Sequence, residues 1–589
     1  MFVKAMSSAQ TEDECGGELA HRSIHPNGCI GRMPANEKNR RFFECVLRMK
    51  INATEESAMR KNHYFTRITG ILLILTLLMT TVAGCGIMED FPGDALTGRE
   101  ETDDFTSLGL SPEFDYEVPE SLPSILVDQM GYAQGSNKIA MICGETPPET
   151  FAVMDAKTGR EVYTGPIEQK GYDDASGMYI SYADFTEFNT AGNYYIQAAA
   201  IGQSYLFEIA ENPYGALFQK VFKQYYYNRC GVTLSAELAG EAAHNACHSR
   251  EAQMKDEAMI KRDVSGGWHV DEIGSRDVNK GCQSVNSMLL AYELYPNAFG
   301  DEMGIPESGN GIPDLLDEVR YEIDWLLKMQ DSTSGAVYDS VSSVDNKTVG
   351  YILYIDGITM NATINYAATM AKFSYLYQSY DREFATLCLK ASDRAYRYAE
   401  QYLADVSAEQ YFFAASELYR ATGGYQYHNI VKSYLTQNPD PDLENDFVFW
   451  GCVTYLSTKQ KVDVNLCETV INDLMRKVET ISYASKGSRL LVVTNENRGG
   501  HAGILRDMTR LAVVDHIITN HEYATVLENH LHYMLGRNLS SISYLDGVGG
   551  RNYRDIDESL GIMNQVDLNA ELLLLLTAIM DDEFVVGEE

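Results

Sequence analysis

The fold of the larger part of this chain is decided by one stretch, Ile305-Pro306-Glu307-Ser308-Gly309-Asn310-Gly311-Ile312-Pro313-Asp314-Leu315-Leu316-Asp317-Glu318, which continues to Trp325-Leu326-Leu327-Lys328-Met329-Gln330. Pro313 suits the start of a helix, because the first helical amide has no partner inside the helix and proline lacks it. Beyond Pro313 the apolar residues recur every three or four positions. The pattern predicts a helix over residues 313–330 with one apolar face, formed by Leu315, Leu316, Val319, Ile323, Leu326 and Leu327.

Helical periodicity extends on both sides of this stretch, beginning at Ala216. None of the helical segments has a strand-like partner, so the sequence predicts an all-α large domain. No glycine-rich phosphate loop and no dinucleotide fingerprint occurs in it, which leaves nucleotide chemistry without support. The further predicted helices cover residues 364–377, 383–403, 414–420, 462–481, 508–518 and 524–535.

A different pattern precedes the helices. Between residues 124 and 213 short apolar runs alternate with clusters of Gly, Asn and Pro, which is typical of an all-β domain. The spacing predicts a β-sandwich of under about 100 residues. Residues 86–119 are rich in Asp, Glu, Gly, Pro, Ser and Thr, as a linker would be. The clearest strand candidates are Ile125-Leu126-Val127, Ile139-Ala140-Met141-Ile142 and Tyr194-Tyr195-Ile196.

An export signal is predicted over residues 59–85. Basic residues precede an uncharged run whose apolar core, residues 71–79, is shorter than the roughly 20 residues that span a bilayer. The run closes with Val82-Ala83-Gly84-Cys85 and resembles a bacterial lipoprotein signal, which implies cleavage before Cys85 and lipid on its thiol. An uncleaved signal anchor is the alternative; both place the body outside the cytoplasm. Residues 1–58 are an upstream mis-start, with translation from Met59, or a disordered segment.

Charge and cysteine usage exclude several classes of protein. The 47 Lys and Arg residues face 84 Asp and Glu residues, a net charge of −37, so binding to nucleic acid would have to overcome repulsion. Such acidity fits a secreted protein that handles neutral sugars and equally fits plain solubility. Seven cysteines follow Cys85, an odd and sparse set that does not look like a disulfide framework.

The stretch at residues 305–330 resembles glycoside hydrolase family 9, and the resemblance spans residues 214–583. Upstream, Val127-Asp128-Gln129-Met130-Gly131-Tyr132 is similar to the first strand of the immunoglobulin-like module that precedes many such domains. The resemblance implies a mainly α protein, with an (α/α)6 barrel behind an immunoglobulin-like β-sandwich over residues 120–213. Other segments agree in order: Tyr226-Tyr227-Asn228-Arg229-Cys230-Gly231, Asp263-Val264-Ser265-Gly266-Gly267-Trp268-His269, Ala414-Ala415-Ser416-Glu417-Leu418-Tyr419-Arg420-Ala421-Thr422-Gly423 and Leu535-Gly536-Arg537-Asn538.

A possible metal site consists of Cys230, Cys247, His248 and His269. Two thiolates and two imidazoles suit tetrahedral zinc, although the spacing is not that of a zinc finger and the set could be incidental. The resemblance implies a structural zinc at these positions. With four protein ligands no position remains for water, so such an ion would hold loops in place and would not activate a nucleophile.

The resemblance also implies an inverting hydrolase, which needs a carboxylate base and a protonated acid roughly 6.5 to 9.5 Å apart. The family places two aspartates after the Gly-Gly-Trp run, in a Trp-x-Asp-Ala-Gly-Asp arrangement. Without a gap these positions hold Val270 and Ile273, which cannot accept a proton. With one inserted residue, Asp271 recovers the first aspartate and Gly274 occupies the second. Asp271 and Glu272 are the candidate base residues, with a solvated acidic loop as the other interpretation.

The family's acid is a glutamate in an Asn-Glu-Val segment near the C-terminus. This chain has Asn564-Gln565-Val566, so Gln565 takes that position under a two-residue gap, and Met563 takes it without the gap. Neither side chain can give the general-acid rate gain of roughly 10² to 10⁴-fold. A longer family loop that grips the glucan is reduced here to Arg551-Asn552-Tyr553-Arg554. Arg551 and Tyr553, with Trp268, are the candidate substrate-binding residues.

Three hypotheses remain open. The first is a surface protein that has lost most hydrolysis but binds β-1,4-glucan or a related oligosaccharide, using some of the chain's 38 tyrosines. The second is an active hydrolase with relocated carboxylates. The third is a structural or assembly protein. Fold alone does not separate them.

Overall fold

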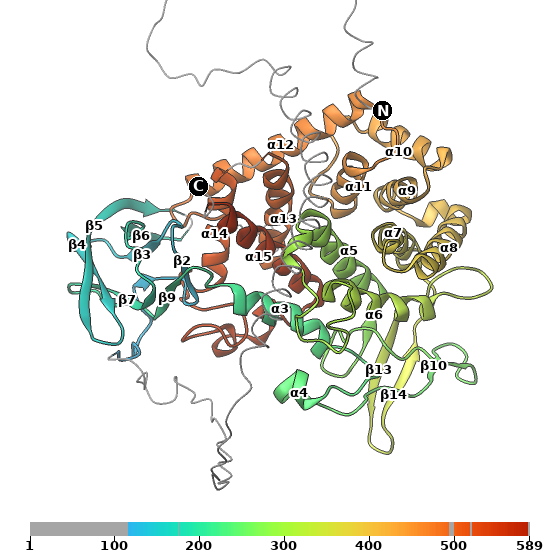
Figure 1. Ribbon diagram of the computed structural model, residues 1–589, viewed down its shortest axis with the longest axis horizontal. Coiled ribbons are helices and arrows are strands. Elements are labelled where there is room, and N and C mark those ends of the chain that lie inside the picture. Colours follow the sequence, from blue (N-terminus) through green and yellow to red (C-terminus); the bar gives the residue numbers. More distant parts are fainter. Residues whose placement is uncertain (1–115, 175, 494–499, 519–520, 587–589) are drawn as a thin grey trace, which may run out of the picture. The chain divides into compact units, whose positions relative to one another are not determined.

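The computed structural model describes residues 116–174, 176–493, 500–518 and 521–586 (Figure 1). These residues belong to one compact unit, Gly84–Glu589. Residues 1–58, the predicted signal peptide with Cys85, and nearly all of the predicted linker lie outside the described residues. Within the described part, no helix combines the length and the apolar character that a membrane crossing requires.

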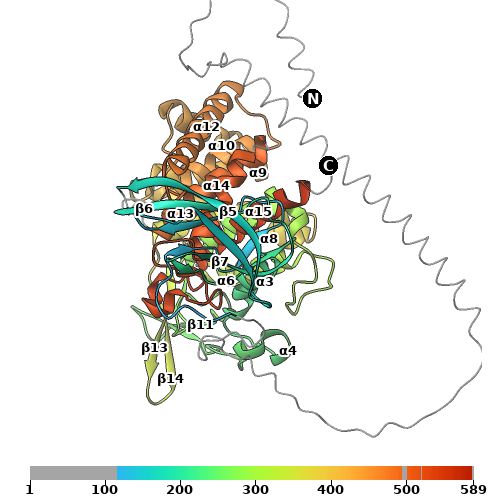
Figure 2. The same ribbon diagram turned by 90° about the vertical axis from the view of Figure 1, so that its left-hand side faces the viewer.

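The N-terminal domain is a β-sandwich, as predicted. Its strands hydrogen-bond in the order β1-β3-β6-β5-β4-β7-β9-β2, with β8 beside β7. The long β5 pairs with β6 in one layer and with β4 in the other, so it joins the two sheets, and Figure 2 shows it crossing the domain. The strands are β1 (Ile125–Leu126), β2 (Gly131–Ala133), β3 (Ile139–Cys143), β4 (Thr150–Asp155), β5 (Arg160–Asp173), β6 (Met178–Asp184), β7 (Gly192–Ala198), β8 (Gly202–Gln203) and β9 (Phe207–Ala210).

Alternation along these strands builds the sandwich core. Ile142, Val153 and Ile196 come from three different strands and are fully buried together. Successive residues of a strand point to opposite faces, so alternate residues of β7 enter the core and the others face away. The apolar runs that predicted strands therefore mark the residues that the two sheets bury between them.

The sandwich is joined to the helical domain by buried polar contacts. Asp128 Oδ2 and His532 Nδ1 share a hydrogen bond of 2.7 Å, and the backbone amide of Gln129 donates to the carbonyl of Leu535. Burial raises the pKa of Asp128 and lowers that of His532, so both groups favour their neutral forms. This pair fixes the first strand segment of the sandwich to the end of helix α14.

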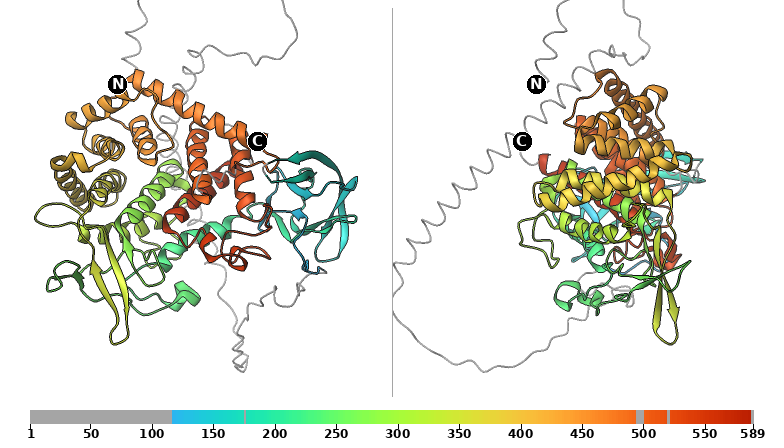
Figure 3. Two further views of the ribbon diagram at one scale, coloured as in Figure 1. Left: turned by 180° about the vertical axis from the view of Figure 1, so that it is seen from behind. Right: turned by 90° about the vertical axis from the view of Figure 1, so that its right-hand side faces the viewer.

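The helical domain is an (α/α)6 barrel, as the resemblance implied. Helices α5, α7, α9, α11, α13 and α15 form an inner ring, in which α5, α7, α9 and α11 pack in succession, α13 packs on α15, and α15 closes back on α5. An ion pair of 2.6 Å between Arg510 and Asp446 links α13 to α11. The outer helices pair with the inner ones, and Figure 3 shows the arrangement from behind.

The helices predicted from the sequence are all present. In the described residues they are α3 (Gly215–Tyr227), α4 (Ala236–Ala239), α5 (Val278–Leu294), α6 (Asp314–Met329), α7 (Met360–Tyr377), α8 (Arg382–Ala399), α9 (Ala408–Thr422), α10 (Tyr425–Gln437), α11 (Asp446–Ser457), α12 (Val464–Gly487), α13 (His501–Ile518), α14 (His521–Met534) and α15 (Val566–Val586).

The prediction that the large domain is all-α is wrong in one region. A five-stranded sheet of order β11-β10-β14-β13-β12 lies beside the barrel. Three of its strands have two or three residues, too few for alternation to be visible, and the hairpin arm β13 is rich in serine. Its strands are β10 (Ala252–Met254), β11 (Lys261–Arg262), β12 (Arg276–Asp277), β13 (Ser340–Asn346) and β14 (Gly350–Ile355).

The deciding stretch folds around buried charges as well as apolar residues. Leu315, Leu316, Val319, Ile323 and Leu326 are buried on α6 as predicted, whereas Leu327 is only half-buried. The same helix also buries Glu318, which forms an ion pair of 2.9 Å with Arg229. Arg229 in turn binds Glu307 of the preceding loop at 2.9 Å, so the loop and the helix are tied to the end of α3.

Candidate functional site

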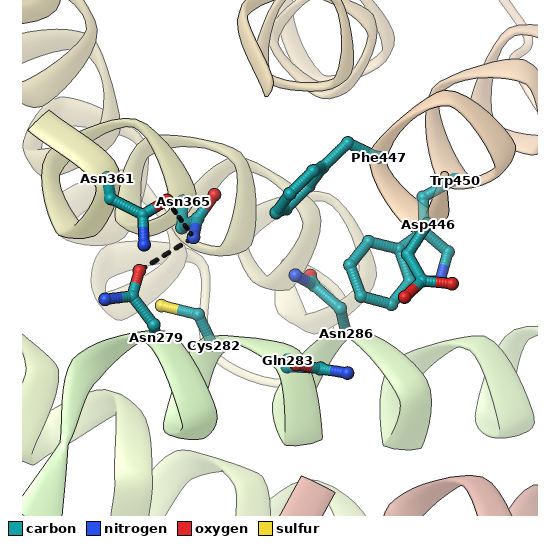
Figure 4. A pocket seen from close by; sticks show the side chains of 9 residues that line it. All are labelled: Asn279, Cys282, Gln283, Asn286, Asn361, Asn365, Asp446, Phe447 and Trp450. Carbon is teal, nitrogen blue, oxygen red and sulfur yellow. Dashed lines mark hydrogen bonds between the residues drawn. The ribbon is translucent and has the colours of Figure 1, made fainter. Parts of the chain in front are cut away.

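A pocket of about 210 Å³ lies inside the barrel where several inner helices begin. It is smaller than the roughly 300 to 1,000 Å³ typical of drug-sized ligand sites, and so suits a small ligand or one unit of a longer one. Figure 4 shows side chains from α5, α7 and α11 converging on it. Its lining consists of Asn279, Cys282, Gln283, Asn286, Asn361, Asn365, Asp446, Phe447 and Trp450.

Each helix that lines the pocket is started by a capping side chain, which fixes its first turn. Such caps satisfy one of the amide groups that a helix start leaves unpaired. Asp339 links two of these starts, since it accepts a hydrogen bond from Thr359 at 2.7 Å and one from Asn279 at 3.4 Å. The caps are Asp277 for α5, Thr359 for α7 and Asn445 for α11, and Ser407 caps α9, which packs on α7.

Side-chain amides dominate one wall of the pocket. Asn365 donates to Asn279 at 2.7 Å and to Asn361 at 3.4 Å, as Figure 4 shows. Gln410, from α9, donates to Asn365 at 3.0 Å and also to Asn361. Amides of this kind hold one another in place and can exchange hydrogen bonds with hydroxyl groups, but they do not transfer protons near neutral pH.

The opposite wall combines an unpaired amide oxygen with two aromatic rings. Asn286 is only 2 % exposed and donates to Thr369 at 3.0 Å, while its Oδ1 has no partner. Leaving a buried polar atom without a hydrogen-bond partner costs free energy. We therefore expect a ligand or a water molecule to donate a hydrogen bond to this oxygen. Phe447 and Trp450 stand edge to face on α11, with ring centres 6.0 Å apart.

Two carboxyl groups, Asp446 of α11 and Glu571 of α15, interact with each other at the side of the pocket that Asp446 lines. Asp446 accepts from Arg510 at 2.6 Å and lies 3.3 Å from Arg506, so two arginine side chains contact it. Glu571 is 5 % exposed, and its Oε2 has no hydrogen-bond partner. Burial, followed by the charge of Asp446, raises the pKa of Glu571 to about 8. This carboxyl is therefore largely protonated at pH 7, and no sequence motif had singled it out.

The structure brings the four predicted metal ligands together. The ligand atoms of Cys230, Cys247, His248 and His269 all lie within 4.8 Å of one another. Cys247 Sγ and His269 Nε2 are 3.5 Å apart, close to the roughly 3.5 Å that two such ligands of one tetrahedral zinc would show. The set is therefore a possible metal-binding cluster.

Short backbone bridges explain how distant positions converge on this cluster. The amide of Cys230 donates to Gly267, and that of His269 donates to Asn228, so the end of α3 lies against the Gly-Gly-Trp run. A second bridge joins Leu234 and His244 and turns the loop back toward Cys247. His244 itself bonds the carbonyl of Asn245 and is not part of the cluster.

The electrostatics of the cluster fit a metal ion. A hydrogen bond between the sulfurs lowers the pKa of Cys247 far below that of an ordinary thiol and raises that of Cys230. His248 Nδ1 is buried and has no partner, although its ring packs against Tyr351 at 4.5 Å. A divalent cation such as zinc would bind both the thiolate of Cys247 and the unpaired ring nitrogen of His248.

The predicted base residues lie on an exposed loop. Asp271 accepts a hydrogen bond from the amide of Ser275 at 2.8 Å and so closes its own turn. Glu272 is exposed beside it. Neither lines the pocket, and this placement is that of the solvated acidic loop. Gly274 has φ +84°, and a Cβ there would lie 2.2 Å from a ring atom of His248.

The other predicted site residues lie in the following places. Gln565 precedes α15 and donates to the carbonyl of Gly561 at 3.2 Å. Trp268 is 1 % exposed and donates from Nε1 to Glu318 at 2.9 Å, so its ring is a core element with no face for a sugar. Tyr553 is also buried, its hydroxyl bonded to Asn564. Arg551 is half-buried and its amide donates to Gln129 of the sandwich.

Comparison with known proteins follows the two domains. Residues 214–560, more than half of the chain, match the family described as glycosyl hydrolase family 9. The chain belongs to glycosyl hydrolase family 9. Residues 120–203 match the cellulase N-terminal immunoglobulin-like domain, so this family 9 protein carries the module that the first strand had indicated.

Relatives of this family 9 protein include two curated bacterial enzymes. It is 27 % identical to a cellodextrinase of Butyrivibrio fibrisolvens over 478 residues, which cover 74 % of this chain and 86 % of the relative. It is 28 % identical to endoglucanase D of Acetivibrio thermocellus over 463 residues, which cover 72 % and 73 %.

A solved structure supports the fold of the family 9 domain. The Zn-binding triple mutant of the family 9 endoglucanase J30 superposes with a TM-score of 0.68 at 22 % identity, covering 77 % of this chain and all of that one. At this identity the likeness concerns the fold. It agrees with the barrel and sandwich described above.

Proposed function

We propose that this family 9 protein binds β-1,4-glucan or a related oligosaccharide in the pocket at the starts of the inner helices and hydrolyses it weakly or not at all. The amide lining of the pocket carries this proposal. Asn279, Asn361 and Asn365 can exchange hydrogen bonds with sugar hydroxyls, and Phe447 offers a flat ring for the apolar face of a sugar.

The names of the relatives support the substrate class. A cellodextrinase and an endoglucanase share more than a quarter of their aligned residues with this chain. A neutral substrate also agrees with the net charge of −37, which disfavours polyanions.

Weak hydrolysis follows from the residues at the expected catalytic positions. Gln565 cannot give up a proton, Asp271 is engaged in closing its own turn, and Val270 and Ile273 carry no carboxylate. An inverting mechanism needs both a placed base and a protonated acid, so losing both removes both proton transfers.

The test combines binding and turnover on the same samples. Isothermal titration with cellotetraose is expected to show binding, and a reducing-sugar assay is expected to stay near background. Asn286→Leu removes the unpaired amide with little change in volume and is expected to weaken binding by about 3- to 10-fold. Phe447→Ala is expected to act similarly, since it removes a pocket ring.

A matched control separates the pocket from general effects. Tyr425 is 74 % exposed on α10, away from the pocket lining, so Tyr425→Ala removes an aromatic ring without touching the site. Its affinity is expected to equal that of the parent. Equal affinities for all three variants, or no binding by the parent, would count against the pocket.

One observation favours a second candidate, an active hydrolase that uses Glu571. This buried carboxyl is largely protonated at pH 7, as a general acid must be, and lies beside Asp446, which is paired with Arg510. Vigorous hydrolysis that disappears in Glu571→Gln and declines above about pH 8 would establish it. Loss of activity in Asp271→Asn or Glu272→Gln would instead identify the acidic loop as the base.

We also propose that Cys230, Cys247, His248 and His269 hold one structural zinc ion. Four protein ligands close the coordination sphere, so the ion would supply rigidity to the loops around the Gly-Gly-Trp run and would leave the chemistry to the chain's own residues.

On the lipoprotein interpretation of Cys85, we also propose that the protein is lipid-anchored to the bacterial cell membrane and faces outward.

A further inference from the structure

A buried arginine lies against the proposed zinc ligands. Arg276 is fully buried, and its Nη1 lies 3.1 Å from Cys230 Sγ. The same Nη1 also lies 3.2 Å from the carbonyl oxygens of Val264 and Gly266. Its Nε and Nη2 have no hydrogen-bond partner.

A guanidinium in this position needs a nearby negative charge. Burying an unpaired charge is costly, and two guanidinium nitrogens without a hydrogen-bond partner add to that cost. The nearby carboxyl of Glu322 supplies little, because burial raises its pKa to about 8 and leaves it mostly neutral at pH 7. The sulfur of Cys230 is therefore the natural counter-charge, since a metal-bound thiolate is an anion.

The position of Arg276 in the chain gives this contact a structural consequence. Arg276 begins β12, where it pairs with Val341 of the hairpin, and the next residue, Asp277, caps α5. Asn279, two residues further on, lines the pocket. The sulfur–guanidinium contact thus ties the cysteine cluster to the start of the helix that forms the pocket wall.

We propose that Arg276 is a positioning residue of the metal centre, which donates a charge-assisted hydrogen bond to the metal-bound thiolate of Cys230 and so orients this ligand and tunes its donor strength. The inference rests on the zinc proposal above. Partners that orient metal ligands in this way typically contribute about 10- to 100-fold to metal affinity.

Binding of Co²⁺ gives a spectroscopic signal that would not change if Arg276 had only a structural role. Co²⁺ takes tetrahedral zinc sites and shows a thiolate-to-metal charge-transfer band whose energy follows the donor strength of the sulfur. Removing the hydrogen bond in Arg276→Gln makes the sulfur a stronger donor, so the band is expected to move to longer wavelength. Zinc affinity, measured by competition with a chelator, is expected to fall about 10- to 100-fold.

Two further variants keep the test decisive. Arg262→Met removes a nearby arginine that contacts Tyr338 and Gln330 but none of the four ligands, and is expected to leave the band and the affinity unchanged. Arg276→Lys keeps the buried charge with a single donor, so its band is expected to move in the same direction by less. If Arg276→Gln does not fold, Arg276→Lys replaces it in the same two measurements.

The outcomes separate this inference from the zinc proposal. An unshifted band and unchanged affinity in the Arg276 variants, with a parent that binds Co²⁺ through thiolate, would overturn the role of Arg276 alone. A parent chain that takes up neither Co²⁺ nor Zn²⁺ would overturn the metal centre itself, and the role of Arg276 with it.

Discussion

Replacing Glu322 by glutamine is expected to stabilise the protein at neutral and alkaline pH. Glu322 is buried on α6, where its Oε2 accepts from the amide of Trp268 at 2.8 Å, and Gly281 of α5 packs against Oε1. Burial raises its pKa from 4.5 to about 8, because the loss of water outweighs the hydrogen bond from Trp268 and the charge of Arg276. Glutamine has the shape of the protonated acid and keeps an acceptor for Trp268.

The sign and size follow from linkage between proton binding and folding. A carboxyl whose pKa is raised by folding supports stability fully below its unfolded value, and that support is lost as the pH rises toward the folded value. The window for Glu322 is therefore about pH 4.5 to 8. A rise of this size corresponds to about 5 kcal/mol at saturation. The advantage of Glu322→Gln over the parent is expected to grow by about 3 kcal/mol between pH 5.5 and 8.5.

Urea unfolding of the zinc-loaded protein at pH 5.5, 7 and 8.5 measures this difference, and Glu318→Gln is the matched control. Glu318 lies one helical turn away and is equally buried, but it is paired with Arg229 at 2.9 Å and accepts from Trp268 Nε1. Breaking a buried pair costs about 3 to 5 kcal/mol, so this variant is expected to lose stability. Parallel pH profiles for Glu322→Gln and the parent, or a loss of stability in Glu322→Gln at pH 8.5, would refute the reasoning.

Three other predictions test the proposed zinc site, the lipoprotein signal at Cys85 and the expected catalytic positions. The folded chain is expected to contain about one zinc per molecule by metal analysis, and Cys247→Ser to lower both metal content and melting temperature; less than about half an equivalent contradicts the site. Cys85→Ala is expected to move the protein from the membrane fraction to the soluble fraction, and continued sedimentation with membranes would end the lipoprotein interpretation. Gln565→Glu alone is expected to leave hydrolysis near background, because groups that act as a unit fail together, whereas adding Val270→Asp and Ile273→Asp tests whether the barrel still holds a productive geometry.

The fold could be predicted because its signals are local and repeated. The face formed by Leu315, Val319 and Ile323 requires only a period of 3.6 to be recognised, and the runs at Ile139 and Tyr194 require only alternation. The five-stranded sheet was not predicted, because β11 and β12 have only two residues each. Pairing between residues as distant in sequence as Arg276 and Val341 also leaves no local pattern. A short strand is defined by its partner, which the sequence does not display.

The cysteine and histidine cluster and the pocket differ in how far the sequence alone predicts them. The four residues of the possible metal-binding cluster could be selected from the sequence because cysteine and histidine are rare and their chemistry is specific. The pocket was not found, because its wall is built from asparagines, which also serve as ordinary caps and turn residues. Asn279, Asn361 and Asp446 share one feature that the sequence does contain, since each is the first or second residue of a helix that follows a capping residue. Knowing which helices form the inner ring turns that feature into a site.

The loop after Trp268 shows why the expected catalytic positions and the metal cluster have to be considered together. Gly274 adopts φ +84°, which favours glycine, and a Cβ there would approach the ring of His248 to 2.2 Å. An aspartate at position 274 is therefore incompatible with the placement of His248 beside Cys247 and His269. Ile273, by contrast, is 45 % exposed and has room for a carboxylate. Of positions 273 and 274, only 273 has room for a second aspartate, and a change that forces one at 274 is expected to disturb the cysteine and histidine cluster first.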